Sequence, residues 1–257
     1  MTSLIVSGLV PFTTVDMPGR NAAVVFCQGC CWRCRYCHNS HLQGAYSDSP
    51  IEWKKILNWL ELRRGFLEAV VFSGGEPIIQ QGLRKSINDV KTMGFEIGLH
   101  TGGSLPKALG DIIPLLDWIG LDIKTHQSAY DRITGINNSG KAVWESLKLT
   151  LLSGIPYEIR TTYHPDLLTE SDIETLAIEL AHTGVKNWVL QLFRPKGCMD
   201  ITLTSNKNTK PSETFLKYIE TIFQYEEELK STNAHPKFHS HQVKIKNKTD
   251  SRTFLVR

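Results

Sequence analysis

The chain has 257 residues, which is enough for one large domain or two small ones with a substantial buried core. Its 41% hydrophobic and 21% charged residues are ordinary for a soluble globular protein. The net charge of +3 is small, and we expect no direct role on nucleic acid. The residues from Thr204 onward hold ten Lys and Arg against six Asp and Glu, so we expect a basic, solvated C-terminal tail.

No uninterrupted apolar run approaches the roughly 20 residues that a membrane-spanning helix needs. The opening segment MTSLIVSGLVPF lacks a basic stretch and reaches Pro11 too early for a signal peptide. We therefore expect a cytoplasmic protein that makes no membrane contact. In that compartment, clustered cysteines are typical of metal or redox sites rather than of disulfides.

Six short segments rich in Val, Ile and aromatic residues predict strands, at 22–28, 69–73, 95–101, 118–124, 157–163 and 188–193. They mostly lack an alternating pattern, as is typical of strands buried on both faces. The helical patterns between them end on glycines, at Gly65, Gly94, Gly154 and Gly184, and the last helix begins with a Thr-x-x-Asp capping pattern. This alternation predicts an α/β fold with a parallel sheet and right-handed crossovers.

Six such units fit either a doubly wound sheet or an incomplete β/α barrel, and periodicity does not separate the two. The unusual residues follow the ends of successive strands, which is where barrel enzymes place their chemistry. We therefore predict a partial (β/α)6 barrel over residues 1–203. Residues 204–257 are predicted to add one helix and a basic, polar, irregular extension.

Five of the six cysteines lie in the segment CQGCCWRCRYCHN, residues 27–39. The spacing Cys-x3-Cys-x2-Cys occurs there in two overlapping frames, Cys27/Cys31/Cys34 and Cys30/Cys34/Cys37. Thiolates at this spacing on one loop can converge on one metal centre. Two alternatives are a closed zinc site on Cys27, Cys30, Cys34 and Cys37, and a ferredoxin-like run from Cys31 that lacks its fourth cysteine.

Local context favours the second frame. Cys27 still belongs to the first apolar strand, so its side chain is committed to the pleat of that strand. Gly29 breaks the strand, which makes Cys30 the first cysteine of the loop, and the aromatic Tyr36 directly precedes the last cysteine of this frame. We therefore predict that the metal ligands are Cys30, Cys34 and Cys37. Three ligands leave one iron of a four-iron cluster open to substrate.

The loop QGCCWRCRYCHN resembles the radical S-adenosylmethionine (radical SAM) enzymes, whose Cys-x3-Cys-x-aromatic-Cys loop binds a 4Fe-4S iron-sulfur cluster. Its ending, Tyr-Cys-His-Asn, resembles the activating enzymes of glycyl radical enzymes in particular. Together with VDMPGR, FSGGEP, LHTGG, DWIGLDIK, YEIRTTYHP and LQLFR, the resemblance covers roughly residues 3 to 200. It is closest to the activating proteins of anaerobic ribonucleoside-triphosphate reductase. It implies a barrel of the radical SAM type, with a 4Fe-4S cluster and S-adenosyl-L-methionine as cofactors.

The resemblance also implies roles for residues at the other strand ends. In SGGEP, the glycines Gly74 and Gly75 allow a close backbone approach to a ligand. The carboxylate of Glu76 then suits the methionine ammonium of S-adenosylmethionine. In HTGG, Thr101 matches the related activating enzymes, whereas His100 replaces their Asp, so its role stays open.

Asp122 and Lys124 alternate along the fourth strand, so they point to one side of it. In the resembling enzymes this Asp-x-Lys segment lies beside the cofactor and near the incoming partner peptide, and Lys124 is the candidate catalytic residue. Arg160 resembles the arginine that approaches the cofactor, and as a buried cation it needs an anionic partner. Gln191 is a further candidate cofactor contact, as is Tyr36 in the cysteine loop.

The implied function is reductive cleavage of S-adenosylmethionine, followed by hydrogen abstraction from one glycine of anaerobic ribonucleoside-triphosphate reductase. A flavodoxin- or ferredoxin-like protein is the expected electron donor. One alternative is an activating enzyme of another glycyl radical enzyme, such as a formate-lyase type. Another is a radical SAM enzyme acting on a small molecule, although Cys198 is the only cysteine outside the loop to support further clusters. A zinc-binding or ferredoxin-like interaction protein is the alternative from a different class.

Overall fold

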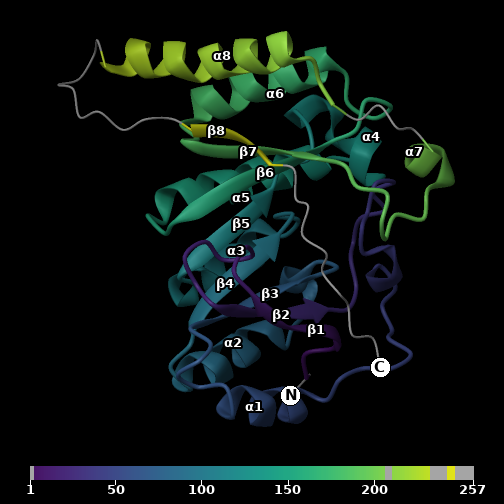
Figure 1. Ribbon diagram of the computed structural model, residues 1–257, viewed down its shortest axis with the longest axis vertical. Helices are drawn as coiled ribbons and strands as arrows, with labels where there is room; N and C mark the ends of the chain where they lie inside the picture. The colour runs from purple at the N-terminus through teal and green to yellow at the C-terminus, as the bar shows by residue number, and fades with distance from the viewer. Residues whose placement is uncertain (1–2, 206–209, 232–241, 247–257) are drawn as a thin grey trace.

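The structure, a computed structural model, describes residues 3–205, 210–231 and 242–246. Its centre is one eight-stranded sheet whose strands lie side by side in chain order (Figure 1). The first strand, β1 (Val6–Thr13), runs antiparallel to β2 (Ala22–Cys27), and all later neighbours are parallel. These later strands are β3 (Ala69–Gly74), β4 (Glu96–Thr101), β5 (Trp118–Asp122), β6 (Tyr157–Tyr163), β7 (Asn187–Leu192) and β8 (Gln242–Lys246).

The strand order decides between the two architectures that the sequence left open. Each strand pairs with the next one along the chain, so the crossovers proceed in one direction and the order never reverses. A doubly wound sheet has such a reversal at its switch point. Because β1 and β8 form separate edges, the sheet stays open. The fold is therefore the predicted partial barrel.

Helices lie around the sheet in Figure 1, at the top, left, bottom and right of the view. They are α1 (Trp53–Glu61), α2 (Leu83–Thr92), α3 (Pro106–Ile112), α4 (Tyr130–Thr134), α5 (Ser139–Leu152), α6 (Glu170–Thr183), α7 (Ile201–Ser205) and α8 (Glu213–Ser231). The capping pattern before α6 is confirmed, since Thr169 accepts a hydrogen bond from the backbone of Asp172 and its own backbone is bonded in return. Among the described residues, no helix has both the length and the apolar character required to cross a bilayer.

Strand alternation divides the core into two layers. On β2, Val25 and Cys27 belong to the large cluster that packs under the helices, whereas Phe26 faces the opposite side. A smaller apolar cluster fills that opposite face, and its members are Val10, Met17, Ala22, Val24, Phe26, Leu42, Ala69, Val71 and Trp118. Further along the same face the side chains become polar, with Asp122 following Trp118 on β5. Chemistry-bearing groups therefore gather at the carboxyl ends of the strands.

Two strands were missed by the sequence analysis. β1 contains Gly8 and Pro11, which both argue against a strand, but Pro is tolerated there because β1 is an edge strand. Within the tail, which was predicted to be irregular and partly extended, residues 242–246 form the strand β8, which pairs with β7. The rest of the tail, residues 206–209, 232–241 and 247–257, lies outside the described residues.

The helix predicted after residue 204 is confirmed as α8, which packs along α6 (Figure 1). Phe223 of α8 is buried, and its ring stacks on that of Trp188 in β7 with centroids 5.6 Å apart. Trp188 is fully buried and donates a hydrogen bond from Nε1 to the hydroxyl of Thr161. The division of the chain at residues 203 and 204 stays a prediction.

Replacing Phe223 tests whether α8 unfolds together with the sheet. Because the Phe223 ring is buried against Trp188, we expect Phe223→Ala to lower the free energy of unfolding by about 3 kcal/mol, measured by urea denaturation. Tyr218→Phe removes only a hydroxyl that bonds Glu174 of α6 at a partly exposed position, and its effect should be much smaller. An unchanged urea midpoint for Phe223→Ala would show that α8 contributes nothing to the stability of the sheet.

Candidate functional site

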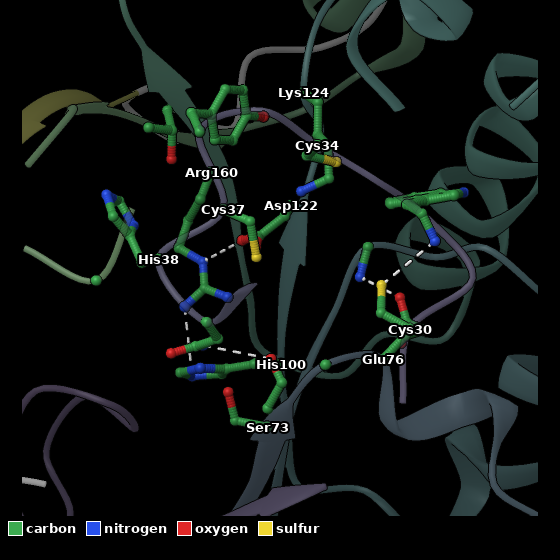
Figure 2. Close-up of a pocket in the computed structure, with 18 of the residues that line it drawn as sticks. Cys30, Cys34, Cys37, His38, Ser73, Glu76, His100, Asp122, Lys124 and Arg160 are labelled. Atoms are coloured by element: carbon green, nitrogen blue, oxygen red, sulfur yellow. Dashed lines mark hydrogen bonds and ion pairs between the residues drawn. The ribbon is translucent and has the colours of Figure 1, made fainter. Parts of the chain in front are cut away.

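A cavity of about 520 Å³ opens at the carboxyl ends of β2 to β7, a volume suited to a small-molecule ligand. All twelve site residues predicted from the sequence line it: Cys30, Cys34, Tyr36, Cys37, Gly74, Gly75, Glu76, Thr101, Asp122, Lys124, Arg160 and Gln191. Figure 2 shows the three cysteines around this cavity together with Glu76, Asp122, Lys124 and Arg160. The structure therefore brings these residues together, whereas their individual roles stay predictions.

The cysteine loop, which we define as residues 29–42, is closed at its base by backbone hydrogen bonds. Gly29 donates to the carbonyl of Leu42 at 2.8 Å, and Cys30 donates to that of Gln43 at 3.3 Å. Inside the loop, the backbone N–H of Trp32 lies 3.4 Å from the sulfur of Cys30. These bonds hold the loop against the end of β2 although most of it has no regular secondary structure.

The two remaining cysteines of the segment do not line the cavity. Cys27 is fully buried on the helix-facing side of β2, opposite to Phe26, whose ring does line the cavity. Cys31 is exposed. A zinc site that includes Cys27 would need its thiol on the other face of β2, so the geometry favours the frame of Cys30, Cys34 and Cys37.

Gly74 and Gly75 line the cavity, but their small size serves a contact within the chain. A Cβ atom at Gly74, whose φ is +120°, would overlap the backbone of Cys27, and one at Gly75 would overlap the carbonyl of Gly29. Gly75 donates a backbone hydrogen bond to Cys27 and Glu76 donates one to Gly29, at 2.9 and 2.8 Å. The sequence-based interpretation, that these glycines admit a ligand, therefore misses the close approach of the cysteine loop.

Glu76 is 1% exposed, and its carboxylate is held by the neighbouring strand end. The Thr101 hydroxyl donates to Oε1 at 2.6 Å, and the backbone N–H of Gly102 donates to Oε2 at 2.8 Å. Burial raises the pKa of Glu76 to about 7, although both hydrogen bonds act in the opposite direction. Glu76 and Thr101, predicted separately as cofactor contacts, are thus bonded to each other.

Lys124 lies just beyond the end of β5, and its ammonium faces two aromatic rings of the cysteine loop. Its Nζ is 5.4 Å from the ring centroid of Trp32 and 5.7 Å from that of Tyr36, within the range of cation–π attraction. The Trp32 ring also fills the place where a side chain at Gly102 would lie. Tyr130 fixes the backbone beneath, since the N–H of Lys124 donates to its hydroxyl at 3.0 Å.

Arg160 is 6% exposed, and its anionic partner is the chain's own Asp122. The two groups meet at 2.8 Å through Nε and Oδ1, and Nη2 donates to the carbonyl of Gly120. Burial acts to raise the pKa of Asp122, but Arg160 and Lys124 outweigh it and hold that pKa below its ordinary value. The buried cation that the sequence analysis singled out is therefore neutralised inside the site.

His100 lies beside this pair, with Nε2 at 3.3 Å from Nη1 of Arg160 and 2.8 Å from the carbonyl oxygen of Asp16. A carbonyl only accepts and a guanidinium only donates, so Nε2 can bond only one of the two, depending on which ring nitrogen carries the proton. Burial, reinforced by the nearby Arg160 charge, lowers the pKa of His100 to about 3. His100 is therefore neutral at pH 7 and tolerates the guanidinium next to it.

Several residues that line the cavity were not predicted from the sequence. They include Trp32, His38, Asn39, Ser73, Arg194 and Lys196. Arg194 and Lys196 lie just after the last predicted strand. The expectation that site residues follow the carboxyl ends of parallel strands would therefore have included them. Trp32 gave no such signal, because its contacts with Gly102 and Lys124 exist only in the folded chain.

Comparison with known proteins gives three kinds of similarity. Residues 24–181 match the family described as the Radical SAM superfamily. A Methanocaldococcus jannaschii protein named for glycyl-radical enzyme activation is 29% identical over 203 residues, covering 76% of this chain and 82% of that protein. The pyruvate formate-lyase 1-activating enzyme of Escherichia coli is 28% identical over 134 residues, covering 49% of this chain and 54% of that enzyme.

Among solved structures, Streptococcus suis SuiB bound to S-adenosylmethionine superposes with a TM-score of 0.57 and 13% identity. The match covers 84% of this chain and 48% of SuiB. At that identity the likeness concerns the fold alone. The chain thus spans about half the length of SuiB and of the Escherichia coli enzyme.

The buried carboxyl of Glu76 predicts a pH dependence of stability. Its folded pKa of about 7 lies above the ordinary 4.5, so its stabilising contribution is complete below pH 4.5 and is lost as the pH rises through 7. Between pH 5 and pH 8 we expect wild type to lose about 2 to 3 kcal/mol of unfolding free energy relative to Glu76→Gln. Urea denaturation of both proteins at the two pH values measures this, and parallel pH curves would contradict the buried, raised carboxyl.

Proposed function

Because the chain belongs to the radical SAM superfamily, we propose that it is an activating enzyme that generates a glycyl radical on anaerobic ribonucleoside-triphosphate reductase. Membership means that the chain is an enzyme that uses a 4Fe-4S cluster and S-adenosylmethionine. The observation that carries the proposal is the separation of the cysteines. Cys30, Cys34 and Cys37 line the cavity, whereas Cys27 and Cys31 do not.

The residues of the cavity fit the cluster. Cys30, Cys34 and Cys37 are free thiols on one loop, and three ligands suit a cluster with one open iron. Lys124 acts to lower the pKa of the Cys34 thiol, although burial outweighs it and raises that pKa. A cluster held by these three thiols would supply the electron for reductive cleavage of S-adenosylmethionine, which would in turn provide for hydrogen abstraction from the partner's glycine.

The remaining residues bind and orient the cofactor. We assign Glu76, held by Thr101, to the methionine ammonium, and Arg160 to the carboxylate or the ribose. Gln191, at the end of β7, is assigned to a further polar contact. We assign Tyr36, which is buried and lines the cavity, to a further cofactor contact.

Two relatives support the class of partner. One is named for glycyl-radical enzyme activation and another for activation of pyruvate formate-lyase. The choice of a ribonucleotide reductase rests on the motifs from VDMPGR to LQLFR in this sequence. Since glycine has no side chain to recognise, the partner is identified through its backbone loop and a wider surface, and a flavodoxin- or ferredoxin-like protein delivers the electron.

The cysteine assignment makes a sharp prediction about variants. After anaerobic reconstitution with iron and sulfide, Cys30→Ala, Cys34→Ala and Cys37→Ala should each lose the cluster and S-adenosylmethionine cleavage, whereas Cys27→Ala and Cys31→Ala should keep both. Bound iron and 5′-deoxyadenosine, formed after dithionite reduction, are the two measurements. Loss of both in Cys27→Ala or Cys31→Ala, with retention in Cys30→Ala, would move the ligands to the other frame.

The partner is tested by electron paramagnetic resonance. The reconstituted enzyme, S-adenosylmethionine and a reductant are mixed separately with an anaerobic ribonucleoside-triphosphate reductase and with a pyruvate formate-lyase from the same cell. We expect a glycyl radical signal on the reductase alone. A signal on the formate-lyase alone would keep the activating class and change the target. Cleavage without a radical on either protein would favour a small-molecule substrate.

A further inference from the structure

The segment that follows β7, residues 193–202, crosses the cysteine loop and is bonded to it through side chains. Arg35 Nε meets Oδ2 of Asp200 at 2.7 Å, and its Nη2 donates to the hydroxyl of Thr202 at 3.0 Å. Asp200 is itself fixed, because its other oxygen accepts from the backbone N–H of Thr202 at 3.0 Å, at the start of α7. We call residues 193–202 the clasp segment.

The clasp segment and the cysteine loop also meet at a second place, through a close backbone approach and two hydrogen bonds from side chains to backbone carbonyls. Gly197 has φ +87°, and a Cβ atom there would overlap the carbonyl oxygen of His38. The hydroxyl of Ser40 donates to the carbonyl of Gly197 at 3.3 Å, and the thiol of Cys198 donates to that of Arg35 at the same distance. Only glycine at position 197 permits this approach.

The clasp segment is anchored to the sheet at both ends. Phe193 is buried, donates its backbone N–H to Tyr163 at 3.0 Å, and stacks on the ring of His38 with centroids 5.4 Å apart. Just beyond the segment, the carbonyl of the buried Leu203 lies 3.1 Å from Nε2 of His164. The contacts with the cysteine loop are therefore made from a fixed support.

These contacts fall on the part of the loop that holds two of the three proposed ligands. Arg35 lies between Cys34 and Cys37 in the sequence, and His38 follows directly after Cys37. This stretch has no helix or strand before the short turn at residues 40–42. A local backbone bond joins Cys37 to the carbonyl of Cys34 at 3.1 Å, and tertiary contacts must supply the rest of its shape. A loop held in its binding shape before the ligand arrives loses less conformational entropy on binding.

We propose that the clasp segment holds Cys34 and Cys37 in the arrangement that the cluster requires, so that Arg35, Gly197 and Asp200 are positioning residues for cluster binding. This inference rests on the proposed function, because it takes the cysteines as cluster ligands. It assigns to the β7–α7 connection a purpose that none of the motifs in the sequence indicated.

Two variants with matched controls test the clasp. Arg35→Ala removes the ion pair but leaves the start of α7 intact, and Arg20→Ala removes a comparable Nε–carboxylate pair, at 2.8 Å from Glu96, away from the cavity. Gly197→Ala adds both backbone strain and the overlap with His38. Gly94→Ala adds the same strain, at φ +91°, with no neighbouring atom within 4 Å. Each control therefore lacks only the contact with the cysteine loop.

Two measurements are made on all six proteins, with wild type and Arg35→Lys included. Hydrogen exchange of the cluster-free chain reports on the amides of residues 30–41, and chelator-driven iron release after reconstitution reports on cluster retention. We expect iron release and loop exchange to be about threefold faster in Arg35→Ala and about tenfold faster in Gly197→Ala. Both controls should stay within a factor of two of wild type, and Arg35→Lys, which restores the charge but not the bond to Thr202, should fall in between.

The outcomes separate the two proposals. Wild type that binds no iron would overturn the proposed function, and the clasp inference with it. Wild type that holds its cluster, with clasp variants that release iron at the wild-type rate, would overturn the clasp alone. If Gly197→Ala fails to fold while Gly94→Ala folds, the surface variant Arg35→Ala still decides the question.

Discussion

The site depends on the close approach of two backbones, the end of β3 and the start of the cysteine loop. Gly74 and Gly75 have no side chain to keep the backbone of Cys27 and Gly29 away, and two hydrogen bonds join the segments. This contact places the beginning of the cysteine loop at the carboxyl ends of β2 and β3. The same contact holds Glu76, the next residue after Gly75, in a buried position. There its carboxylate accepts hydrogen bonds from Thr101 and Gly102 at the end of β4.

The charged groups in the cavity also have partners within the chain. Arg160 lies on a buried strand and is neutralised by Asp122 on the neighbouring strand, while His100 stays neutral beside it. Lys124 needs no carboxylate in direct contact, because two aromatic faces from the cysteine loop stabilise its ammonium. A ligand of this cavity would therefore meet polar groups that are already oriented, which lowers the cost of ordering them.

The sequence predicted the strands β2 to β7 closely because they are buried and rich in Val, Ile and aromatic residues, whose preference for strands is strong. It failed for β1, where Gly8 and Pro11 conceal an edge strand, and for β8, whose residues QVKIK are polar at alternate positions and follow a long basic segment. Both misses concern the edges of the sheet, where burial imposes the weakest pattern.

The sequence by itself identified twelve of the residues that line the cavity, since cysteine spacing and the ends of apolar strands are local features of the chain. Only the tertiary structure decided their partners. Glu76 bonds Thr101 and Asp122 bonds Arg160 across neighbouring strands, and Arg35 meets Asp200 across 165 residues. Such pairs follow from the register of the sheet and from its curvature, and both result from packing the whole chain rather than from any short stretch of it.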